Sequence, residues 1–166
     1  CIRPAVQALQ DLGMHRKVQL IVSGGIRTGA DAAKALALGA DAVSIGMAAM
    51  AALGDNDPSL NEEYAKLHTA AGSYDDWHEG RDPAGITTQD PELSKRLDPV
   101  KAGRRLANYL KVMTLEIQTV ARAAGHNNIH NLEPEDLCAL TLEAAAMARV
   151  PLAGTNWIPG QGQGGL

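Results

Sequence analysis

The sequence has 166 residues, which suits one ordinary domain, and 45% of them are hydrophobic, as in a typical globular protein. The net charge is −4 and acidic and basic residues are mixed, so we expect no nucleic-acid partner. Two cysteines exclude a disulfide framework and no apolar run is long enough to span a bilayer, so we expect a cytoplasmic protein with no membrane partner.

The first third of the chain predicts one strand–helix–strand unit after an initial helix. Val18–Val22 is an apolar run before glycines, which is typical of a buried parallel strand. Thr28 and Asp31 have the spacing of a capping box. The expected elements are a helix over Pro4–Leu12, a strand over Val18–Val22, a helix from Thr28 to Leu38 that ends at Gly39, and a strand over Asp41–Ile45.

The rest of the chain predicts a long excursion followed by helices. Four prolines lie between residues 55 and 99, with a polar helical piece over Glu62–Ala71. A helix with one apolar stripe then ends at Gly125, and another begins near residues 131–136 and stops at Pro151. The stripe is Leu106, Leu110, Met113, Ile117, Val120 and Ala124, and the inner face of the later helix is Leu137, Leu140, Ala144 and Met147.

Two strands cannot close a parallel sheet, because both faces and edges need cover. We therefore expect an α/β chain that forms the last two strands of a (β/α)8 TIM barrel, with the six earlier strands before Cys1 and a helical C-terminal extension. The predicted division is residues 1–54 for the barrel end, 55–99 for a loop over the barrel mouth, 100–155 for the packed helices and 156–166 for a flexible tail.

Glycines follow both predicted strands at equivalent ends. Glycine lets backbone amides approach an anion closely, and the loops after the last two barrel strands are a common phosphate site. The sequence thus predicts a phosphate clamp, with a short helix over Met47–Leu53; the alternative is that the glycines only make a tight turn and a close crossing. The clamp residues are Ser23, Gly24, Gly25 and Ile26 with Gly46, Met47 and Ala48, and Arg27 adds a charge or covers the rim.

Other polar groups have simpler interpretations. The cluster over residues 74–79 suits proton transfer or a cation, but a solvated loop anchored by Trp77 is favoured. His126, His130 and Cys138 lack the fourth ligand of a structural zinc site, so we expect no metal, polar histidines and a buried apolar cysteine. The basic residues Lys101, Arg104 and Arg105 are expected on a solvated face, with anion binding as the weaker option.

The stretch IVSGGIRTGADAAKALALGADAVSIGMAAMAALG resembles the FMN-binding domain of glutamate synthases, and so do TTQDPEL and RRLANYLKVMTLEI in that order. The resemblance runs from Cys1 to about Thr155. The glycine motif alone is shared with other phosphate-binding barrels, including inosine monophosphate dehydrogenase, which leaves a nucleotide dehydrogenase as another interpretation.

The resemblance implies a flavin enzyme whose FMN phosphate is held by the clamp residues named above. Ammonia, released from glutamine by a glutamine amidotransferase-like partner among other synthase subunits, would condense with 2-oxoglutarate, and reduced FMN would deliver hydride to 2-iminoglutarate to give glutamate. Catalytic residues would lie mostly before Cys1. Gln89 and Asp90 would contact cofactor or substrate, although Asp90-Pro91 also suits a plain turn.

The sequence departs from this family where an iron–sulfur cluster is expected. The first ligand position is Asp55, and no cysteine lies between Asp55 and Thr88, so we expect no cluster. The stretches DNDP, YDDWHEGRDPAGITTQDP and PLAGTNWIPG look closest to the large subunit of N-methylglutamate synthase, which exchanges ammonia and methylamine on a glutamate skeleton. Conventional glutamate synthase and a non-catalytic assembly subunit are the alternatives.

Overall fold

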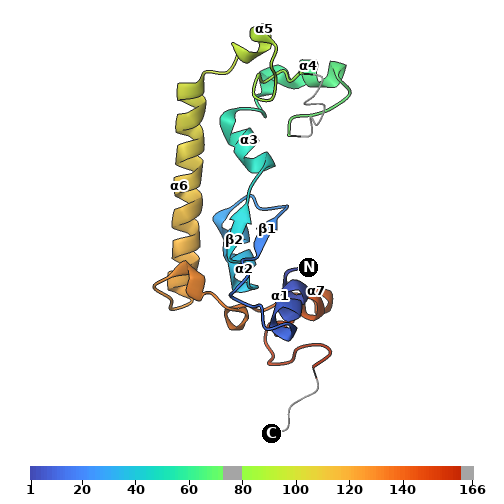
Figure 1. The fold of residues 1–166 in the computed structure, drawn as a ribbon, viewed down its shortest axis with the longest axis vertical. Helices are drawn as coiled ribbons and strands as arrows, with labels where there is room; N and C mark the ends of the chain where they lie inside the picture. The colour runs from blue at the N-terminus through green and yellow to red at the C-terminus, as the bar shows by residue number, and fades with distance from the viewer. Residues whose placement is uncertain (73–79, 162–166) are drawn as a thin grey trace. The chain divides into compact units, whose positions relative to one another are not determined.

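The computed structural model describes residues 1–72 and 80–161 (Figure 1). The chain divides into two compact units, Cys1–Ser44 with Met113–Leu166, and Ile45–Val112. Together they have few strands and many helices, a mixed α/β composition that is compatible with part of a TIM barrel. The finer division at residues 54, 99 and 155 stays a prediction.

The first unit contains the predicted strand–helix–strand. After α1 (Ile2–Asp11) come β1 (Ile21–Ser23), α2 (Gly29–Ala37) and β2 (Ala42–Ser44). The two strands lie side by side and pair in parallel (Figure 1). Ser23 is in register with Ser44. Each strand is shorter than predicted, since Val18 forms only an isolated bridge with His15.

Helix α2 begins and ends where the sequence predicts. The Thr28 hydroxyl accepts the amide of Asp31, whose carboxylate accepts the amide of Thr28, and this capping box satisfies two amides that the helix itself leaves unpaired. The inner face is nearly all small, and Ala32, Ala33 and Ala37 are buried. Small side chains let neighbouring elements approach closely, so alanine is what packs this core.

Burial of the two strands is where the prediction is wrong. Ile21 is 63% exposed, and only Val22 and Val43 in the middle of each strand are partly covered. The reason is topological, because each strand has a single hydrogen-bonded neighbour among the described residues. The apolar run identified the strands correctly, but burial depends on lateral neighbours, and residues 1–72 and 80–161 supply only one for each strand.

Helix α6 (Pro99–Ala123) begins in the second unit and ends in the first. In its second half Met113, Ile117 and Ala121 are buried, while Leu110 and Val120 of the predicted stripe are exposed. The apolar face is therefore rotated from the predicted one. The contact that sets it is between Glu116 Oε2 and the amide of Gly29, at 2.6 Å.

The prediction of one continuous helix from residues 131–136 to Pro151 is wrong. The chain instead forms two short 3₁₀ turns, η2 (Ile129–Asn131) and η3 (Pro134–Asp136), and then α7 (Leu142–Ala148), which Thr141 caps. Leu140 is 86% exposed and Met147 74% exposed. The extended backbone before α7 pairs Ala139 with Leu152, which breaks the helical period that the leucines suggested.

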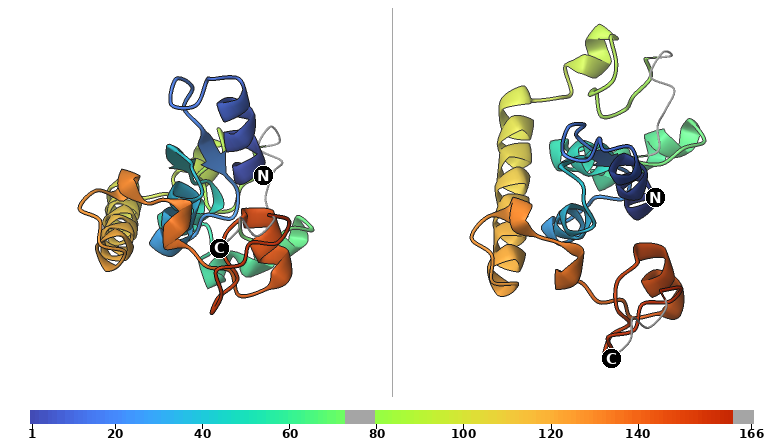
Figure 2. Two further views of the ribbon diagram at one scale, coloured as in Figure 1. Left: turned by 90° about the horizontal axis from the view of Figure 1, so that it is seen from below. Right: turned by 60° about the horizontal axis from the view of Figure 1, so that its bottom comes forward.

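This part of the first unit has a small core of its own. Ala139, Ala145 and Val150 are buried in it, and α7 lies beside α1 (Figure 2). Cys138 is exposed, so its prediction as a buried apolar residue is wrong. Alternation along the extended segment explains this, because Ala139 points inward and its neighbour must point outward.

The second unit is built from short helices. They are α3 (Met47–Leu53), η1 (Pro58–Leu60), α4 (Asn61–Lys66), α5 (Pro91–Ser94) and the start of α6. Helix α3 has the predicted bounds, whereas α4 ends before the predicted Ala71 because His68 adopts a φ of 55°. In the described part of the chain no helix is both long and apolar enough to cross a membrane.

Candidate functional site

The two glycine bends leave the sheet at one edge. Because Ser23 and Ser44 are in register at the ends of parallel strands, the segments that follow them start at the same side. Gly24 and Gly25 have φ values of 106° and 72°, which side-chain-bearing residues rarely adopt. A methyl group on either glycine would meet no atom within 4 Å, so both face open space.

Backbone donors are left free in both segments. The amides of Gly25 and Ile26 donate no hydrogen bond to any residue in ranges 1–72 and 80–161. The same holds for the amides of Met47 and Ala48 in the first turn of α3. Free amides on an exposed bend are the donors that an oxyanion accepts.

The residues around the first bend have other partners. The amide of Arg27 donates to Asp31 Oδ2 at 3.2 Å, so the bend is fixed to the capping box of α2. This amide, then Lys34 and Thr28, lowers the pKa of Asp31. Ser23 is exposed and Ile26 is half-buried. That these residues and the α3 segment hold one phosphate stays a prediction, since the segments belong to different units.

A buried hydrogen-bonded network occupies the place where the family resemblance expects a cluster ligand. Asp55 is 2% exposed, and its two carboxylate oxygens accept the hydroxyl of Tyr64 at 2.5 Å and the amide of Gly72. Burial, and then the carboxylates of Asp55 and Asp82, raise the pKa of Tyr64. The phenol therefore stays protonated and acts as the donor.

Asp82 is the second buried carboxylate of this network. It accepts the amides of Ala84, Ile86 and Thr87 at 2.8 to 3.0 Å, and its Oδ1 lies 3.2 Å from the Tyr64 hydroxyl. Burial by itself would raise the pKa of Asp82, but these amides outweigh it and hold the pKa below its usual value.

Sequence reasoning missed Tyr64 and Asp82. A signal did exist for Asp82, because an aspartate that accepts the amide two residues on is a common turn former, and it precedes Pro83 and Gly85. No local pattern marks Tyr64, whose partners lie 9 and 18 residues away.

The TTQDPEL motif makes a turn and a helix cap. Thr88 Oγ1 accepts the amide of Asp90, and Asp90 Oδ1 accepts the amides of Glu92 and Leu93 at the start of α5. The turn interpretation of Asp90 is thus what the structure shows. Gln89 is exposed, and contact of Gln89 or Asp90 with a cofactor stays a prediction.

The remaining polar candidates do not form a metal site among the described residues. His126 Nε2 lies 2.7 Å from Asp136 Oδ2, and no group of three metal-ligating side chains occurs in residues 1–72 and 80–161. The acidic, aromatic cluster over residues 74–79 lies outside the described residues.

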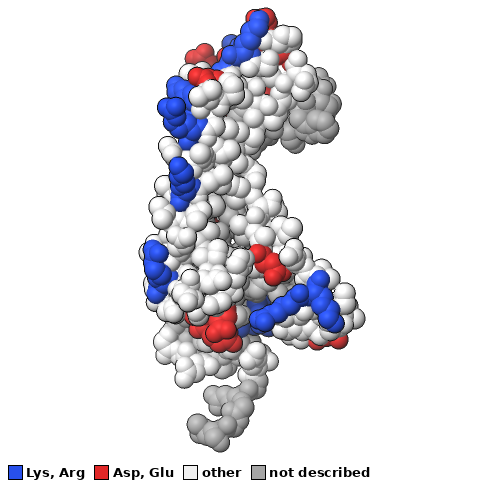
Figure 3. Space-filling model, turned by 60° about the vertical axis from the view of Figure 1, so that its left-hand side comes forward, with Lys and Arg blue, Asp and Glu red and all other residues white. Residues whose placement is uncertain are grey.

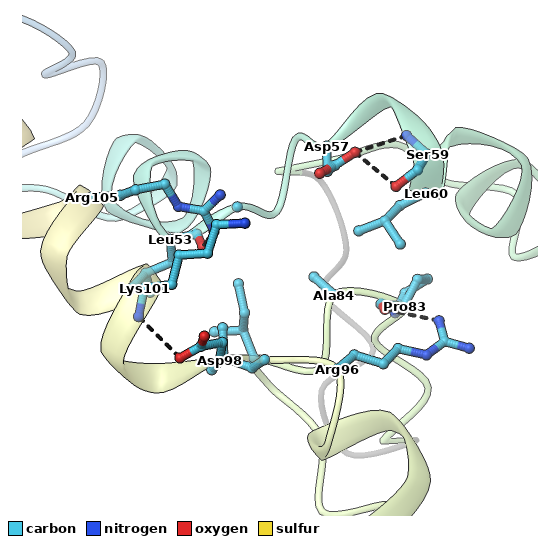
Figure 4. Close-up of a pocket in the computed structure, with 13 residues that line it drawn as sticks. Leu53, Asp57, Ser59, Leu60, Pro83, Ala84, Arg96, Asp98, Lys101 and Arg105 are labelled. Atoms are coloured by element: carbon cyan, nitrogen blue, oxygen red, sulfur yellow. Dashed lines mark hydrogen bonds between the residues drawn. The ribbon is translucent and has the colours of Figure 1, made fainter.

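A pocket of about 230 Å³ lies in the second unit (Figure 4). Its acidic side chains are used as caps. Asp57 accepts the amide and hydroxyl of Ser59, and Asp98 accepts the amides of Val100 and Lys101 at the start of α6. Both carboxylates are therefore structural.

Two arginines of the same pocket are bound by neighbouring carbonyls. Arg105 donates to the carbonyl of Leu53 at the end of α3, and Arg96 donates to the carbonyl of Pro83 (Figure 4). Arg96 also donates to Glu63 on α4. The Arg105 bond joins α6 to α3, and the Arg96 bonds join the segment after α5 to α4 and to Pro83, all within the unit. Four charged side chains of the pocket, those of Asp57, Arg96, Asp98 and Arg105, thus already have hydrogen-bond partners within the unit.

Basic residues line the exposed side of α6. Lys101, Arg104, Arg105, Lys111 and Arg122 are all exposed, as the solvated-face prediction requires for the first three. On the face drawn in Figure 3, the Lys and Arg atoms form separate groups with uncharged surface between them. Spaced cations such as Arg104, Lys111 and Arg122 are typical of a solvated helix face, whereas Arg105 also donates to the Leu53 carbonyl.

Comparison with known proteins decides the family. The family model described as "Conserved region in glutamate synthase" matches residues 1–58 and 73–127, most of the chain. The chain belongs to the glutamate synthase family. A "Glutamate synthase large subunit-like protein" of Rhizobium meliloti is 82% identical over 162 residues, which are 98% of this chain and 37% of that protein.

More distant relatives support the same family assignment. The "Archaeal glutamate synthase [NADPH]" of Methanocaldococcus jannaschii is 44% identical over 76% of this chain, and the "Archaeal-type glutamate synthase [NADPH]" of Thermotoga maritima is 40% identical over the same share. The chain spans 22% of the length of each. No solved structure matches the chain.

Proposed function

We propose that this chain is the FMN-phosphate-binding part of an oxidoreductase of the glutamate synthase family, and that it forms the last two strands of a TIM barrel. The observation that carries the proposal is the pair of in-register strand ends, each followed by amides without an acceptor, at Gly25 and Ile26 and at Met47 and Ala48. Backbone amides bind a phosphate dianion without any side-chain charge.

The residues present suit FMN. Gly24 and Gly25 hold positive φ angles over open space, so the backbone of this bend is accessible to a phosphate ester. The clamp would consist of Ser23, Gly24, Gly25, Ile26 and Arg27 with Gly46, Met47 and Ala48. FMN, when bound, would supply reversible hydride transfer between the flavin and the carbon that carries the amino group. The part of this chain is to orient the phosphate.

The residues present do not suit an iron–sulfur cluster. No cysteine lies between Asp55 and Thr88, and Asp55 itself is buried with both oxygens bound to Tyr64 and Gly72. A cluster needs thiolate ligands. We therefore propose that this protein carries no such cluster, and that its reaction requires no electrons to be delivered through one.

A reaction that needs no electrons from a cluster leads us to the N-methylglutamate synthase type within the family. Replacement of the glutamate amino group by methylamine breaks one C–N bond, forms another and releases ammonia, with no net change in oxidation state. The substrates would be glutamate and methylamine, with 2-oxoglutarate and ammonia as the related pair. Glutamine amidotransferase-like and other synthase subunits would be its partners in the cytoplasm.

Conventional glutamate synthase is the second candidate, because the more distant relatives carry that name with NADPH. The two separate by substrate. The full-length protein, with its partner subunits, is incubated with glutamate and methylamine, and the product is identified by mass spectrometry. N-methylglutamate supports the first assignment, and glutamate formed only from 2-oxoglutarate and an ammonia source supports the second. A full-length protein without flavin absorbance would contradict both.

A further inference from the structure

The pocket of the second unit has two basic side chains on one wall. Lys101 and Arg105 line it from α6, four residues apart, and Figure 4 shows both to one side of the pocket with Asp57 across from them. Side chains at this spacing lie on the same face of a helix, and two like charges placed there repel each other. An anion beside both would remove that repulsion.

The carboxylates of the pocket do not supply this anion. Asp57 and Asp98 accept the amides of the turns that they cap, and the ammonium group of Lys101 forms no hydrogen bond or ion pair with any residue in ranges 1–72 and 80–161. Ser59 is the main cause that lowers the pKa of Asp57, and the charges of Arg105 and Lys101 add to it. Because the charge of Lys101 reaches Asp57, its ammonium group is a free donor on the pocket side of α6.

The structure separates the three basic residues that the sequence places near the start of α6. Lys101 and Arg105 line the pocket, whereas Arg104 does not. Arg105 uses one Nη for the Leu53 carbonyl, which fixes its guanidinium group at the pocket wall. Anion binding, the weaker prediction for these residues, is therefore open to Lys101 and Arg105 but not to Arg104.

The rest of the lining restricts the class of anion. The apolar part of the wall is formed by partly buried side chains, those of Leu53, Leu60, Ile86 and Leu97. A dianion such as phosphate would be repelled more strongly than a monoanion by the two capping carboxylates, and it would leave this apolar wall in contact with water. A single carboxylate on a short aliphatic chain matches both parts of the wall.

We propose that this pocket binds a small monocarboxylate, with its carboxylate group on Lys101 and Arg105 and its aliphatic chain against the leucine and isoleucine side chains. All the lining residues belong to the second unit. None of them is a residue of the phosphate clamp, so the site does not depend on the proposed function.

The test uses the full-length protein and butanoate, which has one carboxylate and no amino group and so differs from the proposed substrates. Calorimetry and saturation-transfer NMR should show that butanoate binds in the millimolar range. Acetate, which lacks the aliphatic chain, should bind more weakly, and butylammonium, which lacks the anion, should not bind. Added sodium chloride should weaken butanoate, because salt screens charges that are open to solvent.

Two lysines of the same helix give a matched pair of variants. Lys101→Gln should weaken butanoate about fivefold, the upper end for an ion pair that is open to solvent. The variant should fold, because the Lys101 side chain has no hydrogen-bond partner in the described part of the chain. Lys111→Gln removes an exposed lysine of α6 that does not line the pocket, and it should leave the affinity unchanged.

Equal affinity of wild type and Lys101→Gln would overturn the proposal, and so would absence of butanoate binding at tens of millimolar. An equal loss in both lysine variants would also overturn it, because that result means unspecific attraction to the basic side of α6. Tighter binding of inorganic phosphate than of butanoate would refute the monocarboxylate class. Circular dichroism of each variant checks that the fold is retained.

Discussion

Tyr64 donates its hydroxyl hydrogen to Asp55 across 2.5 Å, and both side chains are buried. The bond joins Asp55, which directly follows the C-cap residue of α3, to Tyr64 in the middle of α4. Its contribution to stability is measurable.

Removing the Tyr64 hydroxyl should destabilise the protein by about 1–3 kcal/mol, because the buried Asp55 carboxylate loses a donor. Urea unfolding of the full-length Tyr64→Phe variant, followed by circular dichroism, measures this. Asp55→Cys restores the residue type that a cluster would use, yet it should cost at least as much, since both hydrogen bonds are lost. Unchanged stability of both variants would contradict the role of the network.

Acid should weaken the protein through Asp82. The pKa of Asp82 is lower in the folded state than its unfolded value near 3.8, so at acidic pH the unfolded state binds more protons than the folded state. The stability that Asp82 contributes is therefore present above the unfolded pKa and is lost as the pH falls through the lower folded pKa. The free energy of unfolding of wild type should therefore fall steeply between about pH 5 and pH 2. Asp82→Asn should be less stable at pH 7 and show a shallower slope. Equal slopes would refute the assignment.

A methyl group at Gly29 should disrupt the contact between α2 and α6. A Cβ there would overlap with the Met113 carbonyl oxygen and Glu116 Cβ, and a backbone oxygen cannot move aside cheaply. We expect Gly29→Ala to destabilise by about 1–3 kcal/mol.

The matched control for this variant is Gly103→Ala on α6, the helix that Gly29 contacts, where a Cβ meets nothing within 4 Å. It should stabilise by about 0.5–1 kcal/mol, because alanine is the better helix former. Thermal unfolding of the two full-length variants should give melting temperatures that move in opposite directions. Shifts of the same sign would show that the close packing at Gly29 does not matter.

Substitution of Gly25 tests the phosphate clamp. Gly25→Ala adds strain at a φ of 72°, and Gly154→Ala adds comparable strain at a φ of 79°, each in open space. Both should cost about 1–2 kcal/mol of stability. Only Gly25→Ala should lower the FMN content of the purified full-length protein, measured by visible absorbance and by titration of the apoprotein with FMN. Equal flavin loss in both would assign the effect to stability alone.

The parts of the fold that depend on neighbouring residues were predicted well. The capping box of Thr28 and Asp31, the glycine after α2 and the bounds of α3 each follow from hydrogen bonds or backbone angles within a few residues. The caps of α5 and α7, which use Asp90 and Thr141, are equally local, but the sequence analysis did not predict them. Local chemistry is visible in a sequence because its partners are adjacent.

The predictions that failed concerned which side chains are buried. Leu140 and Met147 have helical spacing, but extended pairing of Ala139 with Leu152 interrupts the helix. The buried face of α6 is set by Glu116 reaching a residue 87 positions earlier. Ile21 is apolar and exposed because its strand has one neighbour.

For this protein the sequence alone determined the strand–helix–strand order, the two glycine bends and the absence of cluster cysteines, since these are properties of residue type and short spacing. The tertiary structure alone decided that Asp55 and Asp82 converge on Tyr64, and which face of α6 is covered. Those outcomes depend on contacts between distant residues, and a hydrogen bond or a buried charge exists only once the chain has brought its two partners within reach.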